Sequence, residues 1–201
     1  MKPLLERDLN PDPIRQFATW YAAARRHEGI LQAEAMCLST LSPDGFPAGR
    51  MVLLKEFGSK GFVFYTNFKS SKGQSLLHYP KAALTFFWET MERQVRIVGN
   101  VDLVSEEEAD AYFASRPRLS QVGAWASHQS EKLKNRGELD RRFAAYKKKF
   151  AGKSVPRPPH WGGFLLDPSE IELWQGRPNR LHDRLLYLRR GKRWKIVRLN
   201  P

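Results

Sequence analysis

The chain has 201 residues, a length typical of one domain that can bury a substantial core. Hydrophobic residues make up 41% and aromatic residues 12% of it, which excludes an intrinsically disordered chain. Lysine and arginine outnumber aspartate and glutamate by 34 to 21, a formal net charge of +13. That excess indicates either an ordinary basic surface or a partner that carries phosphate, such as nucleic acid or a phosphorylated small molecule.

Several classes of protein are excluded by missing features. Cys37 is the single cysteine, so the chain forms no intramolecular disulfide, and we expect a reducing, cytoplasmic location. The sequence has no run of about 18 to 20 apolar residues and no secretory signal, so we expect no membrane association. It lacks the glycine-rich nucleotide fingerprints, a GxSxG elbow and histidine pairs four residues apart, and we therefore expect no metal site.

Hydrophobic periodicity and turn signals predict the elements in chain order. A helix begins at Asp12-Pro13, a short helix begins at Ser70 and ends before Pro80, and Ser105 to Glu108 form a capping box that starts another helix. A further helix is expected over 131–150. The predicted strands cover 35–41, 50–57, 62–66, 82–88, 93–104, 163–166, 171–175, 185–188 and 194–199.

The order of these elements predicts the fold class. These predicted strands and three longer helices follow one another without strand–helix–strand alternation, which favours an antiparallel barrel with helices packed outside. The fold class is thus mainly β with α, of the α+β kind. We find no internal repeat and no long linker, so we expect one domain over residues 1–201 with a short N-terminal arm at residues 1–11.

Cations inside predicted strands are the unusual feature of the sequence. Arg50 and Lys55 share one predicted strand and point to opposite faces unless a bulge intervenes. Arg180, His182 and Arg184 alternate, so a regular strand would place all three on one face. Such a face fits an anionic or electron-rich ligand, although a solvated sheet face would show the same pattern.

Two further clusters could bind anions. Ser70, Ser71 and Lys72 combine a helix start, hydroxyls and an ammonium, which suits a phosphate but also suits plain N-capping. Tyr112, Arg116 and Ser120 lie at the end of the capping-box helix, where Arg116 could instead interact with the helix dipole. Trp174 is either a core residue or a wall on which a flat ring stacks.

An ordered set of motifs carries a resemblance to a known family. The chain contains RMVLLK (50–55), FYTN (64–67), SSK (70–72), ERQVRI (92–97), YFASRPRLSQVGAWAS (112–127), HWGGF (160–164), IELWQG (171–176) and RLHDR (180–184). In this order the motifs resemble the pyridoxamine 5′-phosphate oxidase family over nearly the whole chain. The resemblance implies an FMN-binding split β-barrel that forms a homodimer, with FMN at the subunit interface. It also implies oxidation of pyridoxamine or pyridoxine 5′-phosphate to pyridoxal 5′-phosphate, with O₂ reoxidising the flavin to give H₂O₂.

The resemblance also implies roles for individual residues. The expected FMN-binding residues are Arg50, Met51, Val52, Leu53, Leu54, Lys55, Tyr65, Thr66, Ser71, Lys72, Gln94, Gln129, Ser130, Trp174 and Arg184. The expected substrate-binding residues are Lys55, Tyr112, Arg116, Ser120, Arg180 and His182, of which Arg180 and His182 are the expected catalytic pair.

The chain departs from the family pattern at two places. Ser71 stands where many members carry arginine, which removes one charged contact to the FMN phosphate, so we expect weaker FMN retention. Residues 1–7 are also too short to supply much of the N-terminal lid that longer members place over the substrate.

Three alternatives compete with this interpretation. One is a related FMN oxidase of the phenazine type, which would not need the second anion cluster. Another is a basic nucleic-acid-binding barrel, which would interleave aromatic residues with cations on an exposed sheet. The third is a non-catalytic carrier of FMN or pyridoxal phosphate, which Arg180 and His182 make less fitting. The expected partners are therefore a small phosphorylated substrate, O₂ and a second copy of the chain, with no nucleic acid.

Overall fold

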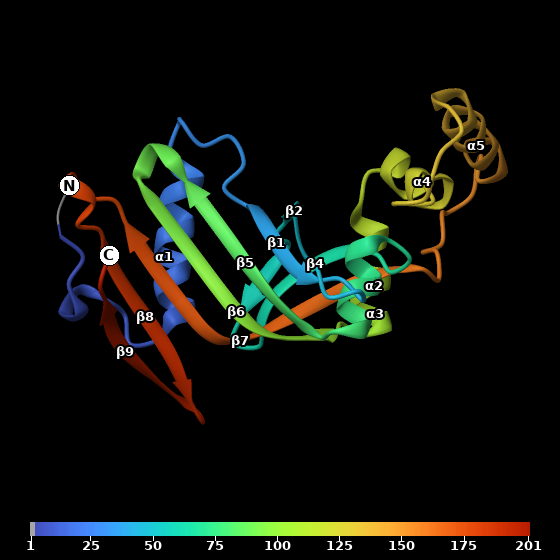
Figure 1. Cartoon of the computed structure of the whole chain (residues 1–201). Coiled ribbons are helices and arrows are strands. Elements are labelled where there is room, and N and C mark those ends of the chain that lie inside the picture. Colours follow the sequence, from blue (N-terminus) through green and yellow to red (C-terminus); the bar gives the residue numbers. More distant parts are fainter. Residues whose placement is uncertain (1–2) are drawn as a thin grey trace.

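The computed structural model describes residues 3–201, so the first two residues of the expected arm 1–11 lie outside it. Its centre is a nine-stranded antiparallel sheet in the order β2-β1-β5-β6-β7-β4-β3, with β8 paired to β7 and β9 paired to β8 (Figure 1). The strands are β1 (Ala35–Leu41), β2 (Pro47–Leu53), β3 (Glu56–Gly58), β4 (Gly61–Asn67), β5 (Lys81–Trp88), β6 (Arg93–Leu103), β7 (Trp161–Gln175), β8 (Asp183–Arg190) and β9 (Arg193–Leu199).

Five α-helices accompany the sheet in the described part of the chain. They are α1 (Pro13–Arg26), α2 (Ser71–His78), α3 (Glu106–Ser115), α4 (Arg118–Ala126) and α5 (Arg136–Lys149). Short 3-10 turns lie at Glu6–Asp8, Glu89–Met91 and Pro178–Arg180. The predicted fold class, an antiparallel split β-barrel with helices packed outside it, is confirmed. None of the helices in residues 3–201 is long and apolar enough to cross a membrane.

The capping signals position three helices as expected. The Asp12 carboxylate accepts hydrogen bonds from the backbone N–H groups of Ile14 and Arg15 at the start of α1. Ser105 and Glu108 form both hydrogen bonds of the capping box of α3. The Ser70 hydroxyl accepts a hydrogen bond from the N–H of Gly73 and begins α2.

The predicted strand 50–57 is wrong, because the chain changes partners in its middle. β2 pairs with β1 and ends at Leu53, whereas β3 pairs with β4 and begins at Glu56. Between them, the N–H of Leu54 donates to Glu34 and that of Lys55 donates to Val63, both at 2.9 Å. Arg50 and Lys55 therefore belong to different segments, and the opposite-face argument does not apply.

The predicted alternation of Arg180, His182 and Arg184 on one strand is also wrong. Residues 178–180 form a 3-10 turn, in which Asn179 and Arg180 have φ angles of 58° and 59°. A left-handed backbone breaks the pleat that alternation requires, and β8 begins only at Asp183.

Three further elements differ from the prediction. Residues 163–166 and 171–175 belong to one 15-residue strand, β7, which pairs with β4, β6 and β8. The predicted helix 131–150 begins at Arg136, because the Asn135 side chain caps that point. The chain also resumes a helix after Pro117 as α4, which the sequence interpretation missed.

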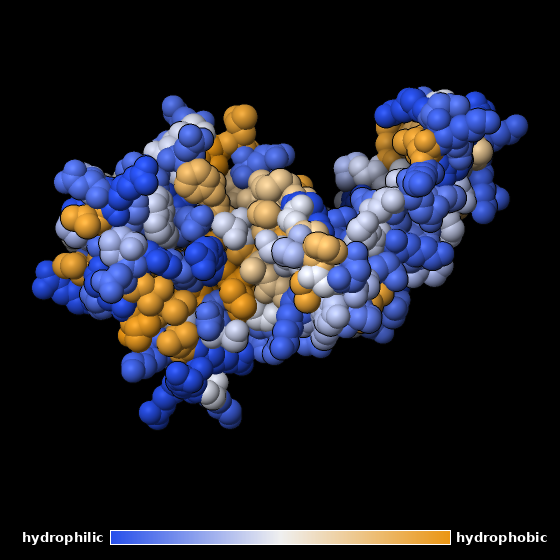
Figure 2. Space-filling model, viewed as in Figure 1, coloured by the Kyte–Doolittle hydropathy of each residue, from blue (hydrophilic) through white to orange (hydrophobic). Residues whose placement is uncertain are grey.

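The main core lies between α1 and the sheet. The fully buried Phe17 ring of α1 has its centroid 4.9 Å from that of Phe57, 5.0 Å from Phe62 and 5.1 Å from Phe86. A smaller cluster forms under α3, α4 and α5 from Phe113, Val122, Phe150, Val155 and Trp161. α4 and α5 make a lobe at the opposite end of the molecule from β8, β9 and the C-terminus (Figure 1). The visible face of that lobe is mostly hydrophilic (Figure 2).

Candidate active site

A cavity of about 800 Å³ lies between β2, β4, α3 and α4. β2 and β4 supply its apolar and aromatic wall, and the end of α3 with α4 closes the other side. The expected site residues that line it are Met51, Val52, Leu53, Lys55, Tyr65, Thr66, Lys72, Tyr112, Arg116, Ser120 and Gln129. Trp161 and Ser127 also line it; both lie inside the recognised motifs, but the sequence interpretation gave them no role.

Lys72 is the centre of a polar cluster at one side of this cavity. Its ammonium donates to Oε1 of Gln129 at 2.9 Å and to Oγ1 of Thr66 at 3.2 Å. The N–H of Ser71 donates to Oγ of Ser130 at 3.2 Å. Burial, and then the nearby Arg50, lowers the pKa of Lys72. Residues from 66–72 and 129–130 thus meet around one partly buried cation.

Arg50 and Leu54 do not line the cavity. The Arg50 Nη1 donates to the carbonyl oxygens of Leu38 and Ala48 and to Oγ1 of Thr40, at 2.7–3.1 Å. Burial lowers the pKa of Arg50, and the positive charge of Arg50 in turn lowers the pKa of Lys72. Leu54 is only 4% exposed and belongs to the main hydrophobic core.

Arg116 carries the second cation of the cavity, at the C-cap of α3. Its Cζ lies 4.7 Å from the centre of the Trp161 ring and 5.5 Å from that of Phe113. Burial lowers its pKa, and its buried Nη1 has no hydrogen-bond partner among residues 3–201. A buried guanidinium nitrogen without a partner is costly, and an anion in the adjacent cavity would satisfy it.

Three stacked aromatic rings support this part of the cavity. The Tyr65 ring lies parallel to that of Tyr112 at 4.0 Å and to that of Trp161 at 5.4 Å. Burial raises the pKa of Tyr65 to about 12, so its phenol stays neutral at ordinary pH. Gly163 allows the Tyr65 ring to lie against the backbone of β7, because a Cβ at this position would lie 2.7 Å from Cε1 of Tyr65.

A second group of expected site residues lies away from the cavity, in one row across three strands. Gln94 of β6 is paired with Trp174 of β7, which is paired with Arg184 of β8. The Arg184 guanidinium donates to both carboxylate oxygens of Glu172, from Nε at 2.8 Å and from Nη2 at 3.3 Å. None of these residues lines the cavity.

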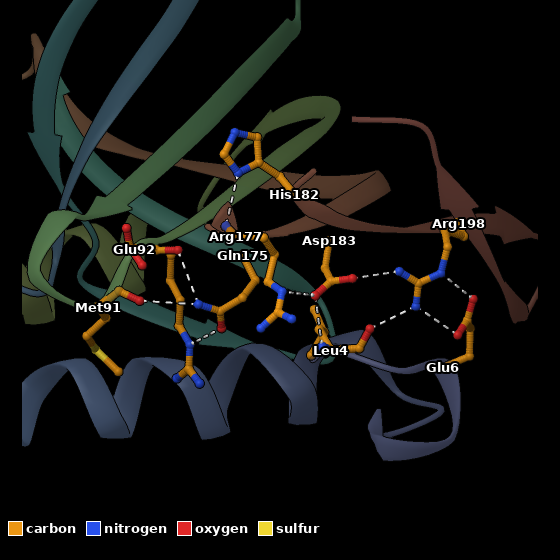
Figure 3. Close-up of polar contacts among 10 residues, drawn as sticks. Leu4, Glu6, Met91, Glu92, Gln175, Arg177, His182, Asp183 and Arg198 are labelled. Atoms are coloured by element: carbon orange, nitrogen blue, oxygen red, sulfur yellow. Dashed lines mark hydrogen bonds and ion pairs between the residues drawn. The ribbon is translucent and has the colours of Figure 1, made fainter. Parts of the chain in front are cut away.

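His182 lies beside this row, with its ring centre 4.6 Å from that of Trp174. Its Nδ1 accepts a hydrogen bond from the backbone N–H of Arg177 at 3.1 Å (Figure 3). A neutral imidazole in that arrangement carries its proton on Nε2, which is then a donor. Arg180, two residues earlier, is exposed on the 3-10 turn.

The N-terminal segment is attached next to this loop by contacts that the sequence did not reveal. Asp183 accepts a hydrogen bond from the N–H of Leu4 at 3.1 Å and pairs with Arg198 at 2.9 Å. Arg198 also pairs with both carboxylate oxygens of Glu6 at 2.9 and 3.0 Å (Figure 3). Residues nearly two hundred positions apart therefore fix the start of β8.

The expected site residues are thus divided between two places within one chain. The cavity group lies towards α3 and α4, whereas the group of Gln94, Trp174, Arg180, His182 and Arg184 lies towards β8 at the other end (Figure 1). Residues 3–201 of one chain do not bring the two groups into a common cavity.

Comparison with known proteins identifies two regions of the chain. Residues 24–150 match the family model described as pyridoxamine 5′-phosphate oxidase. Residues 161–201 match the pyridoxine 5′-phosphate oxidase C-terminal dimerisation region. A pyridoxine/pyridoxamine 5′-phosphate oxidase from Rubrobacter xylanophilus is 54% identical over 98% of this chain and 91% of its own length. A relative of the same name from Gloeothece citriformis is 54% identical over 98% of this chain and 92% of its own length.

Solved structures share the fold of this chain. PhzG from Burkholderia lata, solved in complex with tetrahydrophenazine-1-carboxylic acid, is 31% identical with a TM-score of 0.89, over 100% of this chain and 98% of that one. An FMN-binding protein from Nostoc punctiforme is 20% identical with a TM-score of 0.74, over 96% of this chain and 100% of that one, and it shares the fold. With two family models that cover most of its length and relatives at 54% identity, the chain belongs to the pyridoxine/pyridoxamine 5′-phosphate oxidase family.

Proposed function

We propose that this protein is an FMN-dependent oxidase that converts pyridoxamine and pyridoxine 5′-phosphate to pyridoxal 5′-phosphate in the cytoplasm. One observation carries the proposal: the cavity holds two separate cationic clusters, one at Lys72 and one at Arg116. Two phosphate-bearing molecules, the cofactor and the substrate, would account for both.

The residues around Lys72 fit the FMN phosphate. The ammonium of Lys72, the N–H groups at the start of α2 and the hydroxyls of Thr66 and Ser130 are donors that suit a phosphate dianion. Arg50 adds positive potential nearby. FMN, when bound there, would supply a two-electron acceptor for the hydride from C4′ of the substrate, with O₂ as the final electron acceptor that is reduced to H₂O₂.

The residues around Arg116 fit the substrate phosphate. One nitrogen of the Arg116 guanidinium has no hydrogen-bond partner in the described part of the chain, and Lys55, Tyr112 and Ser120 line the same cavity. Anchoring the phosphate away from the reacting carbon supplies binding energy that orients the pyridine ring. This second cluster favours a phosphorylated substrate over a phenazine precursor, which carries no phosphate.

His182 is suited to orient the substrate. Because Nδ1 already accepts the Arg177 N–H, the neutral ring can only donate, through Nε2. We therefore assign His182 the role of a hydrogen-bond donor to the substrate rather than that of a base. Arg180, on the neighbouring turn, would supply a cation beside the reacting end of the substrate.

A homodimer would complete the site. Trp174, Arg180, His182 and Arg184 all fall within residues 161–201, which match a dimerisation region. A two-fold interface presents the same surface from each subunit, so these four residues of one chain can cover the cavity of the other. Each active site would then combine two subunits.

The colour of the protein tests the proposal directly. Purified protein should be yellow, its flavin absorption should bleach anaerobically with pyridoxamine 5′-phosphate, and the colour should return in air as H₂O₂ forms. Unphosphorylated pyridoxamine is the matched control and should react poorly. A colourless protein that also fails to bind added FMN would contradict the proposal.

A further inference from the structure

Glu172 is a buried carboxylate on the outward face of β7. It is 4% exposed, while its neighbours Ile171 and Leu173 are fully buried on the core side. Side chains two residues apart share a face of a strand, so Glu172 and Trp174 point the same way. In the sheet register, Glu172 lies opposite Arg96 of β6, directly beside the row that holds Trp174 and Arg184.

Two arginine side chains form ion pairs with this buried carboxylate. Arg184 binds Oε1 through Nε at 2.8 Å and Oε2 through Nη2 at 3.3 Å, while the Nη2 of Arg96 lies 3.5 Å from Oε2. The Nη1 of Arg184 also donates to the carbonyl oxygen of Asn200 at 3.0 Å. Contacts on all three nitrogens fix the plane of the Arg184 guanidinium, and Glu172 raises its pKa.

A purely structural role accounts poorly for this arrangement. Replacing a buried ion pair by apolar side chains is often neutral or stabilising, so such a pair is weak evidence for stability. Leu186 lies opposite Glu172 on β8 and would accept an apolar neighbour. Glu172 instead lies where its carboxylate accepts hydrogen bonds from two nitrogens of the Arg184 guanidinium.

We propose that Glu172 is a positioning residue that holds the Arg184 guanidinium in the orientation needed to contact the flavin. The inference rests on the proposed function, which assigns Arg184 to the flavin. It adds an electrostatic consequence: two guanidiniums and one carboxylate leave a net charge of +1 here, and loss of the carboxylate would raise it to +2.

Glu172→Gln tests the role at nearly constant side-chain volume. The amide retains one oxygen acceptor, but its NH₂ group faces a donor of Arg184, so the bidentate contact is lost. FMN affinity should fall about tenfold as Arg184 loses its fixed orientation. The reduction potential of the bound flavin should rise, because the added positive charge stabilises the reduced form.

A double-mutant cycle separates positioning from an independent effect. The dissociation constant of FMN is measured by fluorescence quenching for apo-protein of the wild type, E172Q, R184K and E172Q/R184K, and the potential is measured for each loaded form. Glu170→Gln is the matched control, since Glu170 lies exposed on the same strand. If Glu172 acts through Arg184, the double variant binds FMN no more weakly than R184K alone.

Three outcomes are decisive. An E172Q protein with unchanged FMN affinity and potential, or effects of E172Q and R184K that multiply, would overturn the role of Glu172. A lowered melting temperature with unchanged affinity would reduce Glu172 to a structural ion pair. Wild-type protein that binds no FMN would contradict the proposed function as well. If E172Q does not fold, E172D, which keeps the charge but shortens the side chain, replaces it in the cycle.

Discussion

Arg116 and Lys72 both carry their charge into a partly buried cavity, and in each case burial lowers the pKa. A cation in that position is more available to an anionic ligand than one surrounded by water, because less water has to be displaced. The two side chains differ in their present contacts. Lys72 is hydrogen-bonded to neighbouring side chains, whereas Nη1 of Arg116 has no partner among residues 3–201.

Arg116→Ala should raise the KM for pyridoxamine 5′-phosphate about ten- to hundredfold, with a smaller change in kcat. In the proposed complex the guanidinium would contact the phosphate, which would stay bound through the reaction, so its loss should weaken ground-state and transition-state binding alike. Steady-state kinetics with phosphorylated and unphosphorylated substrate measure the effect, and the preference for phosphate should largely disappear. Lys148→Ala, an exposed cation on α5, is the control. An unchanged KM in R116A would contradict the assignment.

The affinity for FMN should fall at alkaline pH. The pKa of Lys72 lies below its ordinary value, so the ammonium is present below that pKa and is lost, as pH rises, earlier than for an exposed lysine. Titration of apo-protein with FMN from about pH 7 to about pH 10 measures this loss. Lys72→Arg is the control, because its charge persists over the whole range. A wild-type affinity as insensitive to pH as that of K72R would show that Lys72 does not hold the phosphate.

At the scale of elements, α3 brings the proposed substrate-binding residues Tyr112 and Arg116 to the cavity. The capping box at Ser105 fixes where the helix begins, and ten residues later the helix ends at Ser115, with Arg116 as its C-cap. Tyr112, in the last turn of the helix, is held by its stack on Tyr65 and lines the same cavity. The start of the helix therefore determines where its functional end lies.

Ser105→Ala should lower the free energy of unfolding by about 1 kcal/mol and the melting temperature by about 2 to 4 °C. The variant removes the acceptor for the N–H of Glu108. Thermal unfolding followed by circular dichroism measures the loss. Ser154→Ala, at an exposed position outside any helix or strand, serves as the control and should melt like the wild type. Equal melting of both variants would refute a stabilising role for the capping box.

At the scale of the whole molecule, the site is divided between two ends of one chain. Arg116 lines the cavity, whereas Arg180 lies on the turn before β8. In the proposed two-fold dimer, each cavity would receive the other subunit's turn, which would resolve this separation. The variants R116A and R180A would then change residues that different subunits contribute to one site.

Co-expression of R116A and R180A chains should give more activity at low substrate concentration than either variant has alone. Half of a random mixture is heterodimer, in which one site carries both changes and the other carries neither, so about one quarter of the wild-type activity should return. Assays at low substrate concentration measure it, with R116A mixed with wild-type chains as the reference. A mixture no more active than the two variants alone would place both residues in a site within one subunit.

Local patterns in the sequence determined most of the elements. The caps at Asp12, Ser70 and Ser105 predicted three helix starts correctly, because each cap is a hydrogen bond between near neighbours in the chain. The period-2 pattern of residues 35–41 likewise predicted β1, and the structure buries one of its two alternating sets, Met36, Leu38 and Thr40. The ordered motifs indicated the family, which the comparisons confirmed.

Only the tertiary structure decided where those elements place their side chains. The break at Leu54 and Lys55 depends on hydrogen bonds to Glu34 and Val63, and the start of β8 depends on Leu4, Glu6 and Arg198. The lack of a partner for Nη1 of Arg116 among residues 3–201 and the tautomer of His182 both depend on which groups surround these side chains after folding. A sequence pattern records preferences of neighbours, whereas burial and hydrogen-bond partners are properties of segments that meet only after folding.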